Sequence, residues 1–138
     1  MDAGQKRTTS IVSASAVALL TLCVFFVSLN KGPASAVTRF HEGLSRPDAA
    51  LVRDVTGGDV NSAAALDLRA RIAYLLRIGS RFQVTRVEKV RENAQVLVVY
   101  RSPSGNTYTV PFYLWKTNGS WVIDSEKTLS LIDRQRVG

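Results

Sequence analysis

The chain is nearly devoid of cysteine and histidine: its 138 residues include one of each. The cysteine, Cys23, lies inside a long apolar run, so the rest of the chain has no disulfide and no thiol nucleophile or thiol metal ligand. A lone histidine such as His41 is more often structural than catalytic. The sequence also lacks a nucleophile elbow, a phosphate-binding glycine loop, metal-ligand spacing and paired carboxylates. We therefore expect no cofactor, no metal and no enzyme of these signature classes.

Acidic residues are also scarce, with 11 against 18 lysines and arginines and a net charge of +7. A positive surplus attracts anionic lipid headgroups, acidic proteins or nucleic acid. The arginines are scattered through the expected helices and strands rather than gathered in one tract, which is typical of a solvated surface. We therefore expect no nucleic-acid partner.

Charge is absent altogether from residues 11–29. As a helix this run is about 28 Å long, close to the hydrocarbon thickness of a bilayer, about 30 Å. The run thus predicts a single transmembrane helix whose partner is the lipid bilayer. Lys6 and Arg7 face only Lys31 across it, so the positive-inside rule places the N-terminus in the cytoplasm. The alternative is a cleaved signal peptide, with a small-x-small site at residues 34–36.

The rest of the chain predicts one extracytoplasmic domain of common size. Residues 1–10 are expected to be a cytoplasmic stub, residues 33–130 the domain, and residues 131–138 a frayed tail. Helical spacing and turn signals first predict three helices, beginning after Pro33 and covering residues 48–55 and 61–78. Strands are then predicted at residues 82–90, 94–101, 107–116 and 121–127.

Two local features refine the expected sheet. Asn118-Gly119 is a strong signal for a tight hairpin turn. Pro111 lies within the third expected strand, where it cannot donate a ladder hydrogen bond, so it predicts a bulge or an edge position. The layout predicts an α+β fold with helices on one face of a curved, four-stranded antiparallel sheet.

This layout ends in the hairpin Lys116-Thr117-Asn118-Gly119-Ser120-Trp121-Val122-Ile123-Asp124. With helices before it, the hairpin resembles the nuclear transport factor two-like (cystatin-like, SnoaL-like) superfamily, whose members often end in "basic, x, x, Gly, x, Trp, apolar, apolar, Asp". Structurally, Gly119 completes the turn and Trp121 buries its indole beneath the helices. The resemblance implies a fold that houses enzymes, adaptors and secretion-system parts alike, so it does not decide function.

One implied function is a small-ligand enzyme of the ketosteroid-isomerase or SnoaL-like type. Such enzymes place an acid or base and a tyrosine in a pocket between sheet and helices. The candidates here are His41, Asp67 and Tyr74, with further tyrosines in the strands. Asp67 is placed to pair with Arg71, four residues later on a helix. This pairing on an exposed face is the expected role of Asp67.

We favour a membrane-anchored binding or assembly module with an unknown protein partner. The layout also resembles inner-membrane assembly components of bacterial secretion and conjugation systems. Superfamily members commonly dimerise through the open sheet face, so a homodimer is a further expectation. The candidates for a ligand pocket or an interface are the aromatic residues of the second and third strands, Tyr100, Tyr108, Phe112, Tyr113 and Trp115.

Overall fold

The computed structural model describes residues 32–137 of the chain. The predicted cytoplasmic stub (1–10) and transmembrane helix (11–29) lie outside the described residues. Within residues 32–137, no helix is both long and apolar enough to cross a bilayer.

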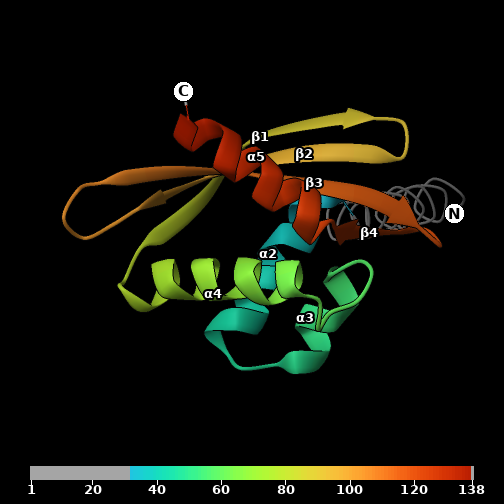
Figure 1. Cartoon of the computed structure of the whole chain (residues 1–138), viewed down its shortest axis with the longest axis horizontal. Coiled ribbons are helices and arrows are strands. Elements are labelled where there is room, and N and C mark those ends of the chain that lie inside the picture. The colour runs from blue at the N-terminus through green and yellow to red at the C-terminus, as the bar shows by residue number, and fades with distance from the viewer. Residues whose placement is uncertain (1–31, 138) are drawn as a thin grey trace, which may run out of the picture. The chain divides into compact units, whose positions relative to one another are not determined.

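The described part is an α+β domain with helices first, then a strand meander and a last helix (Figure 1). This confirms the predicted class, helices with a four-stranded antiparallel sheet. The elements are α2 (Pro33–Ser45), α3 (Ala49–Val55), α4 (Ala63–Arg77), β1 (Arg81–Val90), β2 (Asn93–Arg101), β3 (Thr107–Thr117), β4 (Ser120–Ile123) and α5 (Ser125–Val137).

The helices begin at residues suited to the start of a helix. Pro33 occupies the first turn of α2, where its missing N–H has no helical partner to lose. The side chain of Asp48 accepts a hydrogen bond from the Leu51 N–H (3.1 Å) and caps α3. Ser62 caps α4 in the same way through the Ala65 N–H (3.2 Å). Local chemistry therefore fixes all three starts.

The four strands pair antiparallel in the order β1-β2-β3-β4. The β3–β4 turn places Asn118 and Gly119 at φ 49° and 76°, which confirms the predicted tight turn. The β1–β2 turn uses Arg91 at φ 55°. The pairing of β1 with β2 contains a bulge between Val84 and Arg86.

Pro111 lies on an open edge of β3, one of the two positions predicted for it. Strand β4 pairs only with residues 114–117 of β3. The Tyr113 N–H donates instead to Thr128 Oγ1 (3.0 Å), on the side away from β2. Pro111 precedes Tyr113 by two residues and so presents its nitrogen to the same side. The missing N–H therefore interrupts no strand pairing.

The end of the chain differs from the prediction. The fourth strand stops at Ile123, and the residues predicted as its second half and as a frayed tail form α5. Asp124 causes the change: its side chain accepts from the Lys127 N–H (3.0 Å), and its carbonyl accepts from the Thr128 N–H (3.0 Å). Because Leu129 and Ile132 also pack against the core, the helix is held in place.

The core lies between the helices and one face of the sheet. Phe40 of α2 packs edge-on against Phe112 of β3, with ring centroids 6.0 Å apart. Trp121 is buried, as the sequence predicted, and the ammonium groups of Lys89 and Lys116 lie 5.7 and 6.0 Å from its ring. Period-2 alternation places these core residues of the strands on the helix-covered face.

Gly43 marks a close approach of α2 to α3. A Cβ at this position would lie 2.7 Å from Val52 Cγ2. We expect Gly43→Ala to destabilise the domain by about 1–3 kcal/mol through overpacking. In a Val52→Ala background the contact with Cγ2 is lost while the Val52 nitrogen (3.3 Å) and the Asp48 oxygen (3.4 Å) stay close, so we expect the cost of the same change to be smaller. Urea unfolding of the four proteins tests this, and equal effects in both backgrounds would contradict it.

Candidate functional site

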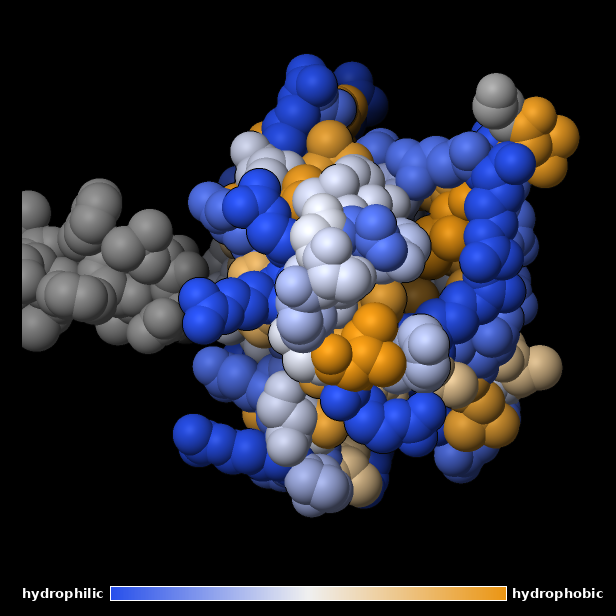
Figure 2. All heavy atoms as spheres, turned by 90° about the vertical axis from the view of Figure 1, so that its left-hand side faces the viewer, coloured by the Kyte–Doolittle hydropathy of each residue, from blue (hydrophilic) through white to orange (hydrophobic). Residues whose placement is uncertain are grey.

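An open groove lies between α4, the first half of β3 and the second half of α5. It encloses about 780 Å³. Figure 2, which faces the left-hand side of Figure 1, shows hydrophobic residues in a recess bordered by hydrophilic ones. The groove is lined by Ala70, Arg71, Ile72, Tyr74, Leu75, Ile78, Thr107, Tyr108, Thr109, Val110, Ile132, Gln135 and Arg136.

The groove follows from the shortness of β4. Because β4 pairs only with the far end of β3, the first half of β3 has no strand on its outer side. Helix α5 contacts both β3 and α4 there and supplies the third wall of the groove. An ion pair joins the two helical walls, with Arg71 Nη1 of α4 lying 3.2 Å from Asp133 Oδ1 of α5.

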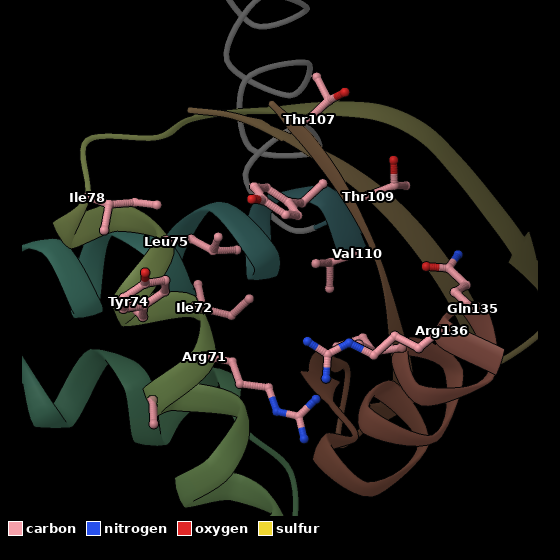
Figure 3. A pocket seen from close by; sticks show the side chains of 13 residues that line it. Arg71, Ile72, Tyr74, Leu75, Ile78, Thr107, Thr109, Val110, Gln135 and Arg136 are labelled. Atoms are coloured by element: carbon pink, nitrogen blue, oxygen red, sulfur yellow. The ribbon is translucent and has the colours of Figure 1, made fainter. Parts of the chain in front are cut away.

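The groove combines an apolar interior with two arginine side chains at one end, of which Arg71 is paired with Asp67 and Asp133. Ile72, Leu75 and Val110 point into the space between α4 and β3, and the guanidinium groups of Arg71 and Arg136 point toward one another (Figure 3). Arg71 is already bound to Asp67 (2.9 Å), and this hydrogen bond raises the pKa of Arg71. Such a site suits a ligand with an apolar body and an anionic group.

Exposed aromatic residues add to the apolar surface of the groove. Tyr74 is 54% exposed and Tyr108 is 45% exposed. The Arg77 guanidinium lies 5.7 Å from the Tyr74 ring. None of the described residues that line the groove is a histidine, aspartate, glutamate or cysteine.

His41 lies in the core, away from this groove, and pairs with Tyr100. Both side chains are completely buried. His41 Nδ1 lies 2.7 Å from the carbonyl oxygen of Val37, which can only accept, so Nδ1 carries the proton. The Tyr100 hydroxyl therefore donates to the unprotonated Nε2. Every polar atom of the pair is thus satisfied by a partner inside the protein.

Burial sets the protonation state of this pair. It lowers the pKa of His41 to about 4, against a smaller opposing effect of the Val37 hydrogen bond. Burial also raises the pKa of the Tyr100 hydroxyl. The imidazole stacks on Phe82 with ring centroids 4.1 Å apart and meets the edge of Phe40. His41 is therefore a neutral, aromatic member of the core at pH 7.

The three residues singled out for acid–base chemistry lie in different environments. His41 is in the core, while Asp67 forms the predicted exposed ion pair with Arg71. Of the three, only Tyr74 lines the groove. The structure thus brings together His41 and Tyr100, which are 59 residues apart in the sequence, rather than the three candidates.

The aromatic candidates for a pocket or an interface also lie in different parts of the domain. Tyr100 and Phe112 are core residues with no exposed surface, and neither lines the groove. Tyr108 lines the groove. Tyr113 and Trp115 alternate with these residues along β3 and so lie on the opposite face of the sheet. Trp115 is 40% exposed there, and the Lys127 ammonium lies 4.3 Å from the Tyr113 ring.

Several groove residues escaped the sequence analysis. Ile72, Leu75 and Ile78 lie in the third predicted helix but were not singled out, and Arg136 fell in the predicted tail. The only signal for them was the apolar stripe of α4, which does not distinguish a groove from a packed core. Residues 32–137 contain no group of three or more metal-ligating side chains.

Comparison with known proteins adds a likeness of architecture. No family among those compared matches the chain, and no curated protein matches it. Residues of this α+β domain are similar to a solved structure from Campylobacter jejuni described as an NTF2-like (nuclear transport factor two-like) transpeptidase. The two share 14% identity with a TM-score of 0.47, over 67% of this chain and 97% of the other.

Proposed function

We propose that this chain is a single-pass membrane protein whose extracytoplasmic, nuclear transport factor two-like domain is a binding module. The groove between α4, β3 and α5 is its ligand site. The ligand class is an elongated apolar molecule, or an apolar segment of a partner protein, that carries one anionic group. The uncharged run at residues 11–29 supports the membrane anchor.

The Arg136 guanidinium at one end of an apolar groove is the observation that carries this proposal, because the neighbouring Arg71 is already paired with Asp67 and Asp133. Guanidinium groups bind carboxylates and phosphates through charge-assisted hydrogen bonds. The half-exposed rings of Tyr74 and Tyr108 provide apolar area that a ligand would remove from water. The anionic group and the apolar body of an amphipathic ligand therefore both contribute to its binding free energy.

The lining favours binding over acid–base catalysis. A general base near neutral pH is usually a histidine or a carboxylate, and neither lines the groove in the described part of the chain. His41 has a suitable side chain, but it is sealed in the core. A ketosteroid-isomerase type of reaction and a role in secretion-system assembly remain the alternatives predicted from the sequence. A homodimer through the outer sheet face also stays a prediction.

Replacing Arg136 with alanine should weaken binding of an anionic apolar probe. We expect the affinity of the full chain in lipid nanodiscs for 8-anilinonaphthalene-1-sulfonate to fall about tenfold, the value of about 1.4 kcal/mol of charge-assisted hydrogen bonding. Affinity for the neutral probe N-phenyl-1-naphthylamine should stay unchanged. Fluorescence titration with both probes, corrected for empty nanodiscs, measures the difference.

Two further variants delimit the site. Arg134→Ala removes an exposed arginine of the same helix that does not line the groove, and should leave both affinities unchanged. Leu75→Asp places a carboxylate inside the groove and should weaken both probes. Equal effects of the two arginine substitutions, or full binding by Leu75→Asp, would show that the probes bind elsewhere.

A further inference from the structure

We propose that one end of the sheet rests on the membrane surface and binds anionic phospholipid headgroups. This basic end consists of Lys89, Val90, Arg91, Trp115 and Lys116. The inference rests on the membrane anchor proposed above, but it concerns a surface separate from the groove.

The strand register brings these residues together. Val90 of β1 pairs with Asn93 of β2, and Asn93 pairs in turn with Trp115 of β3. The Lys116 N–H donates to the carbonyl of Glu92 in the β1–β2 turn (2.7 Å). The turn that contains Arg91 therefore lies directly beside the end of β3. Strands β1 and β3 and the β1–β2 turn thus meet at one end of the sheet, with Lys89 and Lys116 on its helix-covered face and Val90 and Trp115 on the opposite face.

The composition of the basic end suits a lipid interface. The ammonium groups of Lys89 and Lys116 lie 5.7 and 6.0 Å from the ring of Trp121, so both cations are held at this end of the sheet. Val90 is 69% exposed and Trp115 is 40% exposed. Tryptophan is enriched at membrane–water interfaces, where its ring meets both apolar and polar surroundings. Cations and exposed apolar side chains are thus combined at one end of the sheet.

The nearby carboxylates do not cancel this charge. Glu88 is bound to Arg86, with 2.5 Å between their side-chain atoms. Glu92, in the turn, is the other carboxylate of this hairpin. Lys89, Arg91 and Lys116 therefore leave a positive surplus. A surplus of this kind next to exposed apolar residues is complementary to an anionic bilayer surface.

The direction of α2 shows at which end of the domain this helix begins. Phe40 contacts Phe112, and His41, one residue later, contacts Tyr100. Tyr100 lies four positions along β2 from Val96, the partner of Phe112. Helix α2 therefore runs away from the basic end and begins beside it, in contact with β4 (Figure 1).

The connection to the anchor is short. Three residues separate Leu29, the last residue of the predicted span, from Pro33 at the start of α2. Even fully extended, this connection covers only about 14 Å. In the proposed anchored chain, the first turn of α2 is therefore tethered within about 14 Å of the hydrocarbon. The short connection and the positive charge of the basic end then both favour contact with anionic headgroups.

Quenching of tryptophan fluorescence by lipid bromine tests this contact. Trp115 and Trp121 are the chain's two tryptophans, and Trp115→Phe assigns the signal between them. The full chain is reconstituted into vesicles of brominated phosphatidylcholine alone or mixed with brominated phosphatidylglycerol. We expect quenching of Trp115 to be about twofold greater with the anionic lipid, and the excess to be lost in 0.5 M salt.

A matched pair of triple variants makes the result specific. Lys89→Gln, Arg91→Gln and Lys116→Gln together should abolish the excess quenching. Arg46→Gln, Arg53→Gln and Arg134→Gln remove the same charge from exposed positions elsewhere and should preserve it. Quenching independent of lipid charge, or equally reduced by both triples, would overturn the proposal.

The anchor itself is tested separately on the same vesicles. A chain that resists carbonate extraction from pure phosphatidylcholine vesicles is anchored, whatever its quenching. If the chain is retained but the quenching does not respond to anionic lipid, the basic end is not a lipid surface and the anchor stands. If the chain is extracted, the proposed anchor fails and the orientation argument fails with it.

Discussion

Acidification from pH 7 to pH 4 is expected to remove about 3 kcal/mol of folding stability through His41 alone. Burial lowers the pKa of His41 from its ordinary value of 6.5 to about 4. Between these values the unfolded chain binds a proton that the folded protein excludes. Stability therefore falls as the pH falls through this window, and the loss is complete below pH 4.

Protonation is costly here because it breaks a satisfied pair. The Tyr100 hydroxyl donates to Nε2, so a proton on Nε2 turns the hydroxyl oxygen into the acceptor and deprives the hydroxyl proton of its partner. Phe82, Phe40 and Phe112 surround the ring and offer no carboxylate to neutralise the charge. The site is thus built for a neutral imidazole.

His41→Gln serves as the control, because glutamine does not titrate. Urea unfolding at pH 7, 5.5 and 4 gives the stability of both proteins. The stability advantage of the parent protein over the variant should shrink by about 3 kcal/mol across this range, since all other titrating groups are shared. Parallel pH profiles for the two proteins would show that His41 does not carry the effect.

Phe112→Ala is expected to destabilise the domain by about 3–5 kcal/mol. The ring has no exposed surface and packs against Phe40 and His41 in the centre of the core. Truncation leaves a cavity that neighbouring helices and strands cannot close without moving together. Unfolding in urea, followed by tryptophan fluorescence, measures the loss.

Tyr108→Ala is the matched comparison on the same strand and the same face. Because Tyr108 is 45% exposed at the groove, its truncation should cost no more than about 1 kcal/mol. A large cost at both positions would mean that the groove is part of the packed core. A small cost at both would mean that Phe112 is not held in the core as described.

The sequence predicted those features that depend on neighbours in the chain. The Asn118-Gly119 turn, the burial of Trp121 and the Asp67–Arg71 pair each follow from spacing of a few residues. The alternation of apolar residues also predicted the order of helices and strands. These parts of the fold are local in origin.

The features that the sequence analysis missed depend on residues that are far apart in the chain. The His41–Tyr100 bond joins α2 to β2, and neither partner signals the other in the sequence. The groove depends on where α5 lies, and that position follows from Asp124, whose capping ends β4 early. Because Asp124 follows an apolar run, the pattern alone favours a longer strand there. Capping chemistry outweighed strand preference at this one residue.

Helix α5 also has a practical bearing on work with this protein. Arg136 lines the groove and Val137, the next residue, is 90% exposed. An affinity tag or fluorescent fusion joined to the C-terminus would therefore emerge at the rim of the proposed ligand site. Such an appendage could occupy or screen the groove and mimic a loss of binding.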